Sequence, residues 1–86
     1  MNTVELLEDA IALAVRSGYR VRHEWLGGRA AGDCEIKGSK WIFLDLALGP
    51  ADQLELVLDA LRRQPATLTL PMPQQLWDLL QVRKSA

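Results

Sequence analysis

The N-terminal segment carries apolar side chains at the spacing of one helix face. The apolar positions that recur three or four residues apart are Val4, Leu7, Ile11, Ala14 and Val15. Asn2 followed by Glu5 fits a capping box, in which two side chains satisfy free backbone N–H groups at a helix start. Gly18 is placed to end the helix, because glycine adopts the left-handed conformation at C′ without strain. The pattern predicts a helix over Thr3–Ser17.

After Gly18 the hydrophobic period changes to two. The residues of one set are Tyr19, Val21, His23 and Trp25, and those of the other set are Arg20, Arg22 and Glu24. This alternation predicts a strand with the first set packed and the second set in solvent. The glycine-rich run Gly27–Gly32 then predicts a flexible connection.

Two short runs flank Gly38-Ser39, and together they predict a hairpin. Glycine at the first loop position accepts positive φ, which suits a two-residue type II′ turn. That turn pairs Lys37 with Lys40, Ile36 with Trp41, Glu35 with Ile42, and Cys34 with Phe43. Because side chains alternate along a strand, alternate residues share a face. The residues on the face that we expect to pack on the core are Cys34, Ile36, Trp41 and Phe43.

The opposite face of this hairpin is mostly polar. Its charged residues are Asp33, Glu35, Lys37 and Lys40. Ile42 and Leu44 lie among them, so the third strand is apolar on both sides. This double apolar character predicts a central position in the sheet, or a partner that covers the second face.

The C-terminal half predicts two more helices with a short strand between them. Pro50 suits the first turn of a helix, and the apolar stripe that follows is Leu54, Val57, Leu58 and Leu61. Thr67–Leu70 alternates like a strand and stops at Pro71, and we expect it to pair parallel to the third strand. A final helix begins at Pro73.

These elements predict one α+β domain over residues 1–81, followed by a frayed tail over 82–86. The expected order is α-β-β-β-α-β-α in two layers. The sheet is expected to be an antiparallel meander whose fourth strand runs parallel to the third. The helices are expected mainly on one face.

Composition narrows the class of protein. The chain has 86 residues, of which 49% are hydrophobic and 24% are charged, as in a globular domain. The formal net charge is −1, so no global basic field attracts nucleic acid. A single cysteine excludes an internal disulfide, and no apolar run reaches the ~20 residues that span a bilayer. We expect a cytoplasmic protein that has no membrane partner.

The stretch His23-Glu24-Trp25-Leu26-Gly27 begins like the zinc motif H-E-x-x-H. Gly27 replaces the second histidine, and the strand pattern places His23 and Glu24 on opposite faces. A looser metal site could combine His23, Cys34 and either Asp33 or Asp45, but only the first two converge in the expected sheet. Gly27–Gly32 has the outer spacing of a phosphate loop without its Lys-Ser pair or following helix. We therefore predict a non-enzymatic protein with no metal and no cofactor.

Two binding surfaces follow from the expected sheet. The possible nucleic-acid patch comprises Arg20, Arg22, Arg29, Lys37 and Lys40. RNA-binding sheets usually add exposed aromatic rings, whereas the rings here are expected to face the core, so nucleic acid is the alternative function. The possible protein interface comprises Ile42, Leu44 and Trp77, although Trp77 is expected first of all to seal the core. We expect a protein–protein interaction domain that binds an unknown partner or forms a homodimer.

Several short motifs resemble those of a set of short bacterial proteins without an assigned activity. The motifs are Leu26-Gly27-Gly28, Gly32-x-Cys34, Lys37-Gly38, Phe43-x-Asp45, the leucine-rich helix and the Leu-Pro-Met-Pro segment before the last helix. The resemblance spans about Tyr19 to Leu80. It implies the same hairpin and helix arrangement, and it carries over no activity and no catalytic residue.

Overall fold

The computed structural model describes residues 2–28 and 32–82. In chain order the elements are α1 (Thr3–Arg16), β1 (Tyr19–Glu24), β2 (Gly32–Ile36), β3 (Ser39–Asp45), α2 (Pro50–Arg62), the 3₁₀ helix η1 (Pro65–Thr69) and α3 (Gln74–Gln81). The α+β class and the three helices expected from the sequence are confirmed. The expected tail lies outside the described residues except for Val82, which follows α3.

The first helix begins where its sequence predicts and ends one residue earlier. The side-chain oxygen of Asn2 accepts a hydrogen bond from the Glu5 backbone N–H at 2.9 Å, and the Asn2 amide donates to the Glu5 carboxylate. At the other end Gly18 has φ +102°, a conformation that glycine adopts without strain. Ser17 caps the helix instead of belonging to it.

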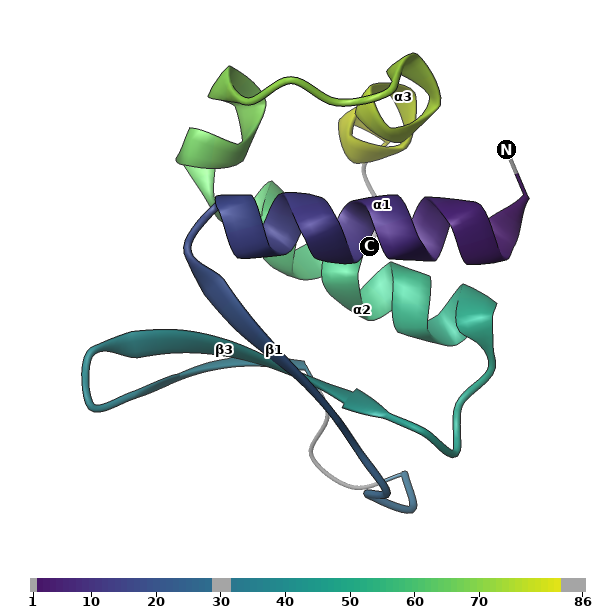
Figure 1. Ribbon diagram of the computed structural model, residues 1–86, viewed down its shortest axis with the longest axis vertical. Helices are drawn as coiled ribbons and strands as arrows, with labels where there is room; N and C mark the ends of the chain where they lie inside the picture. Colours follow the sequence, from purple (N-terminus) through teal and green to yellow (C-terminus); the bar gives the residue numbers. More distant parts are fainter. Residues whose placement is uncertain (1, 29–31, 83–86) are drawn as a thin grey trace.

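The sheet has three strands in the order β1-β3-β2 (Figure 1). β1 pairs parallel to β3, and β2 pairs antiparallel to β3. The expected meander is therefore wrong, because β1 pairs with β3 and not with β2. The expected central position of the third strand is confirmed. β3 is apolar at alternate positions on both sides, which suits the strand that is flanked on both edges.

The hairpin turn lies one residue earlier than the sequence predicts. Lys37 has φ +49° and Gly38 has φ +81°, so both loop residues are left-handed, as in a type I′ turn. The observed pairs are Ile36 with Ser39, Glu35 with Lys40, Cys34 with Trp41, and Asp33 with Ile42. The shift keeps the same alternate residues together, so the shared face of Cys34, Ile36, Trp41 and Phe43 is confirmed although the register is wrong.

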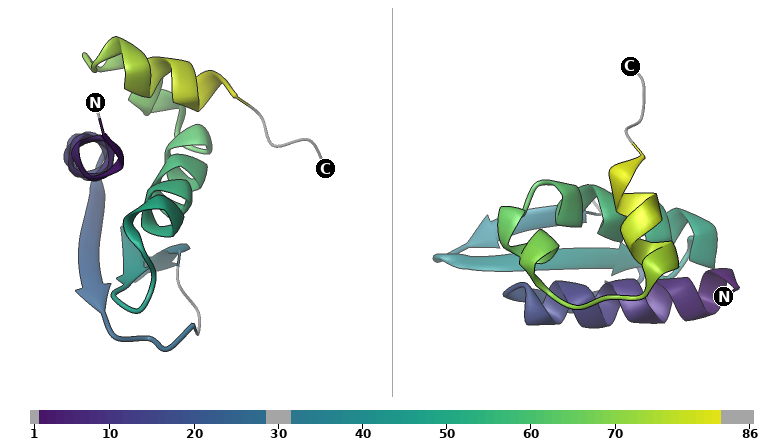
Figure 2. Two further views of the ribbon diagram at one scale, coloured as in Figure 1. Left: turned by 90° about the vertical axis from the view of Figure 1, so that its right-hand side faces the viewer. Right: turned by 90° about the horizontal axis from the view of Figure 1, so that it is seen from above.

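The core lies between the sheet and the helices. Figures 1 and 2 show α1 and α2 on one face of the sheet, and α3 on the side of these helices that faces away from the strands. The largest fully buried apolar side chains are Leu13, Ile42, Leu44, Val57, Leu58, Leu61 and Leu76. Two helices above one sheet face thus form the main interface of the fold.

The predicted fourth strand is wrong, because its residues lie mostly in η1. The Thr67 N–H donates to Gln64 O, and the Leu70 N–H donates to Thr67 O, so local i to i+3 bonds satisfy this backbone. Thr67 is fully buried, and its hydroxyl lies 3.1 Å from that of Ser17 at the end of α1. The segment follows α2 on the helical side of the molecule, away from any strand edge.

Candidate functional site

One face of the sheet carries no helix among the described residues (Figure 1). We call it the open face. Its strand residues are Arg20, Arg22 and Glu24 from β1, Gly32, Cys34 and Ile36 from β2, and Ser39, Trp41, Phe43 and the buried Asp45 from β3. The register places Arg20 beside Trp41 and Arg22 beside Phe43. The open face therefore joins basic and aromatic side chains from different parts of the chain.

This arrangement corrects the expected orientation of the hairpin. Ile42 and Leu44 are fully buried under the helices, whereas Trp41 and Phe43 are only half-buried. Ile42 and Leu44 are therefore core residues and do not form an exposed interface. The parallel pairing to β1 decides the orientation, because the packed residues of β1, Tyr19 and Val21, share a face with Ile42 and Leu44.

The aromatic residues of the open face form a stack with Arg20. The Trp41 and Phe43 ring centroids are 5.7 Å apart, and their planes differ by 9°. The Arg20 guanidinium carbon lies 5.5 Å from the centroid of the Trp41 ring, within the range of a cation–π contact. These contacts order three large side chains on a surface that the helices leave uncovered.

The exposed charges of the open face are positive on balance. Arg22 forms an ion pair with Glu24 at 3.0 Å, and the two side chains are 60% and 41% exposed. Arg20 remains as a cation over the Trp41 ring. Glu24 is the only exposed carboxylate among the described strand residues of this face. A negatively charged partner therefore meets more attraction than repulsion here.

Asp45 at the end of β3 holds the connection after β1 in place. Its carboxylate accepts backbone N–H bonds from Leu26 at 3.1 Å, Gly28 at 2.6 Å and Ala47 at 2.9 Å. The bonds from Ala47 and Gly28 lower the pKa of Asp45 from 3.8 most strongly, although desolvation acts in the opposite direction. The segment that begins like a zinc motif is thus the end of a strand and a loop anchored by this carboxylate.

The positions of His23 and Cys34 exclude the metal site considered for them. His23 pairs with Leu44 on the side of the sheet that carries the helices, whereas Cys34 lies on the open face. Their expected proximity is therefore wrong. Within residues 2–28 and 32–82, no three His, Cys, Asp or Glu side chains gather as a metal site requires.

The expected nucleic-acid patch is divided by the fold. Arg20 and Arg22 lie on the open face, and Lys37 lies in the hairpin turn. Lys40 pairs with Tyr19 and belongs to the opposite face. Arg29 lies outside the described residues.

The two other tryptophans are not part of the stack. Trp25 follows β1 and is 77% exposed, so its expected place in the core is wrong. Trp77 is 36% exposed on α3, which lies beyond α1 and α2 (Figure 2). Trp77 and the open face therefore cannot form one continuous contact surface.

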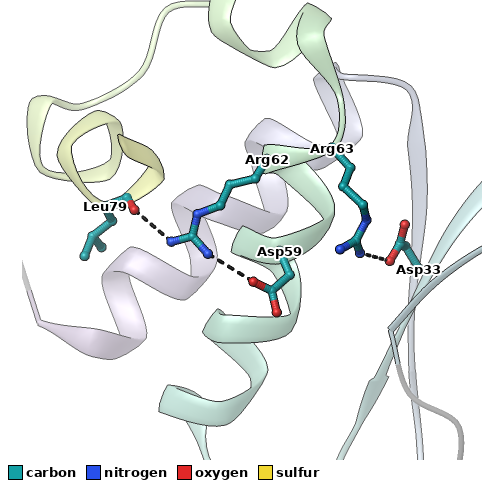
Figure 3. A network of polar contacts seen from close by, with 5 residues as sticks. All are labelled: Asp33, Asp59, Arg62, Arg63 and Leu79. Carbon is teal, nitrogen blue, oxygen red and sulfur yellow. Dashed lines mark hydrogen bonds and ion pairs between the residues drawn. The ribbon is translucent and has the colours of Figure 1, made fainter. Parts of the chain in front are cut away.

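A second polar cluster surrounds the C-terminal end of α2 (Figure 3). Arg62 donates to Asp59 at 3.0 Å and to Leu79 O at 2.8 Å, which ties α3 to α2. Arg63 forms an ion pair with Asp33, which ties β2 to the same helix end. These contacts join neighbouring elements, so we assign them a structural role.

Tyr19 lies beside this cluster and links β1 to α2. Its hydroxyl donates to Ala60 O at 3.2 Å. Burial raises the pKa of Tyr19, Asp33 raises it further, and Arg63 acts in the opposite direction. The hydroxyl therefore stays protonated near neutral pH and serves as a hydrogen-bond donor.

No family model, curated protein or solved structure matches this chain. The resemblance to short bacterial proteins therefore stays a prediction. In the described part of the chain, no helix has both the length and the apolar character needed to cross a bilayer. The fold defines a small α+β domain in which helices cover one sheet face and, among the described residues, leave the other open.

The sequence interpretation missed Trp41 and Phe43 as surface residues. The alternation of β3 alone does not indicate which of its sides faces solvent, because both sides are apolar. A usable signal lay in β1, where Arg20 and Arg22 clearly mark a solvent face. Pairing β1 directly with β3 would have placed the aromatic rings beside these arginines.

Proposed function

We propose that this chain is a protein-binding domain and that the open face is its binding surface. The single observation that carries the proposal is the ordered stack of Arg20, Trp41 and Phe43 on a face without a covering helix. Tryptophan and arginine dominate the binding energy of protein interfaces, because they bury a large area and retain polar contacts. Ile36, which is 44% exposed, extends the apolar surface toward β2.

In this proposal the domain binds and does not catalyse. The carboxylates nearest the open face have structural partners, since Asp45 anchors a loop and Asp33 pairs with Arg63. The Cys34 thiol is free and exposed on the binding surface. A reducing compartment such as the cytoplasm keeps such a thiol from forming mixed disulfides.

Photo-crosslinking in the cells that make the protein tests this function. A photoreactive phenylalanine analogue replaces Ile36 on the open face, and a matched variant carries it at Glu8, an exposed position of α1. We expect protein adducts of discrete mass from position 36 and not from position 8. Adding Trp41→Ala to the first variant should remove these adducts, while circular dichroism shows that the variant remains folded.

The opposite pattern excludes the proposal. If position 36 gives no protein adduct, or if positions 36 and 8 give the same adducts, the open face has no specific protein partner. Adducts that persist with Trp41→Ala would likewise show that the aromatic stack is not part of the contact.

Binding of single-stranded nucleic acid is the second candidate. It is favoured by the shared face of Arg20 and Arg22 with Trp41 and Phe43, since bases stack on aromatic rings while arginines contact phosphates. It ranks second because the Trp41 ring already has Arg20 over it and Phe43 stacked beside it. The net charge of −1 also provides little long-range attraction.

A fluorescence titration with mixed single-stranded RNA and DNA tests this candidate. The prediction is salt-sensitive binding that is lost in an Arg20→Ala/Arg22→Ala variant. Lys40→Ala is the matched control, because Lys40 lies on the opposite face. Absence of binding at low salt excludes nucleic acid as the ligand of the open face.

A further inference from the structure

We infer that the occupant of the open face is an amphipathic helix of a partner protein that presents carboxylates along one side. The inference rests on the proposed function, because the binding surface is the same. It adds the secondary structure and the charge of the partner segment. Three independent observations lead to it: the size of the face, the state of its backbone, and its charge.

The size of the face matches a single helix. Three strands of six, five and seven residues cover an area about 20 Å long and about 14 Å wide. This amounts to roughly 300 Å², so a partner on this face makes a small contact compared with the about 800 Å² that each partner of a standard interface buries. A helix about 10 Å in diameter and about 14 residues long matches these dimensions.

The backbone of the open face has no free hydrogen-bonding groups in β3 with which an extended peptide could pair. β3 is flanked by β1 and β2, so its backbone groups already pair within the sheet. A peptide lying on this face in extended conformation would leave its own N–H and C=O groups without partners at the contact. A helix satisfies its own backbone and contributes side chains alone. Helices also cover the opposite face of this sheet, where α1 and α2 pack (Figure 1).

The distribution of charge sets the chemistry of this helix. On the open face the apolar surface of Trp41, Phe43 and Ile36 lies beside the guanidinium groups of β1. The carboxylate of Glu24 is engaged with Arg22 at 3.0 Å, so Arg20 has no anionic partner on this face among the described residues. A bound helix therefore needs an apolar stripe for the aromatic side and aspartate or glutamate for the β1 side.

Selection from a phage library of helical peptides tests this inference. The library is selected on the immobilised full chain, and clones are retained if they lose binding to Trp41→Ala. We expect the retained peptides to combine an apolar stripe with a net negative charge. Their affinity should fall at least tenfold for Arg20→Glu and less than twofold for Lys40→Glu, a matched charge reversal on the other face. Circular dichroism verifies that the variants are folded.

Other results of this selection would contradict the inference. Retained peptides that are neutral or basic, or that bind Arg20→Glu as well as the original chain, overturn the acidic helix. In that case the Trp41 dependence still supports a protein-binding face. Displacement of the peptides by a single-stranded oligonucleotide at low salt would also overturn the inference, in favour of nucleic acid. If no clone depends on Trp41, the inference fails, whereas the proposed function is judged separately by crosslinking in cells.

Discussion

The two sides of β3 contain similar numbers of large apolar side chains but differ completely in their surroundings. Ile42 and Leu44 are fully buried beneath α1 and α2, whereas Trp41 and Phe43 are half-buried on the open face. Both pairs occupy alternate positions of one strand. The difference therefore arises from what covers each side and not from the strand itself.

This comparison separates stability from binding within a single strand. The helix-covered side contributes most of the free energy of folding that this strand can supply, because its side chains lose all contact with water. The open side retains apolar surface that a partner can still bury. Branched aliphatic side chains pack well in the dry core, while tryptophan and arginine tolerate partial exposure and suit an interface.

The largest expected effect comes from truncating the covered side. We expect Leu44→Ala to lower the free energy of unfolding by about 2–5 kcal/mol, because it leaves a cavity under the helices. Phe43→Ala, the adjacent residue on the open side, should cost only about 1 kcal/mol. Urea denaturation followed by circular dichroism measures both values. Equal losses for the two variants would contradict the assigned difference between the two sides.

A smaller effect is expected where Asp45 ties the end of β3 to the loop after β1. Asp45→Asn should lower the thermal unfolding midpoint, because the amide is a weaker acceptor for the Leu26, Gly28 and Ala47 N–H groups. In the folded state the pKa of Asp45 lies below 3.8, so its stabilisation is present above that value. It is lost as the pH falls through 3.8 and then through the lower folded-state pKa.

The pH dependence of stability provides the control for this prediction. Between neutral pH and pH about 3, the original chain should lose more stability than Asp45→Asn, because the variant has no carboxylate to titrate at this position. Unfolding midpoints measured over this range check the difference. Identical pH profiles would contradict the role given to the charge.

The hairpin turn determines the pairing of β2 with β3, and substitutions in it should have the next largest effect on stability. Gly38 has φ +81°, and an added Cβ meets no atom within 4 Å, so Gly38→Ala strains only the backbone. We expect a loss of about 1–2 kcal/mol in unfolding free energy. Lys37→Asn is the matched variant, since asparagine accepts the left-handed conformation of Lys37 more readily and should cause no loss. Denaturation curves that show the reverse order would exclude the assigned turn.

The smallest expected effect on stability belongs to the charged edge of the open face. Arg22→Ala removes an ion pair whose side chains are 60% and 41% exposed, so the free energy of unfolding should change by less than about 0.5 kcal/mol. Its affinity for acidic helical peptides should nevertheless fall. A thermal unfolding curve and a peptide titration separate the two effects. A larger loss of stability would place Arg22 in the folding network instead of at a binding surface.

Local elements of the fold could be predicted from the sequence. The expected helix over Thr3–Ser17 matches α1 because Asn2, Glu5 and Gly18 give local signals for both of its ends. The stripe after Pro50 likewise predicted α2. The alternation of β1 correctly placed Arg20 and Arg22 in solvent. Each of these signals depends on neighbours within a few residues.

The candidate site was predicted only in part. Arg20 and Arg22 were expected on a basic face, but the aromatic rings were assigned to the core. The error followed from the assumed meander, in which β2 lies beside β1. β1 pairs with β3 although β2 lies between them in the sequence. The local pattern of polar and apolar residues does not show this pairing, because it depends on contacts between residues far apart in the chain.

The sequence by itself determined the start of α1 and α2 and, to within one residue, the end of α1, and it determined that the third strand is apolar on both sides. Capping residues, glycine conformation and hydrophobic period act within one or two turns of chain, so they can be identified without the fold. Only the tertiary structure decided which side of β3 the helices cover. That choice depends on the combined packing of α1, α2 and β1 on one face, and it leaves Trp41 and Phe43 beside Arg20 on the other.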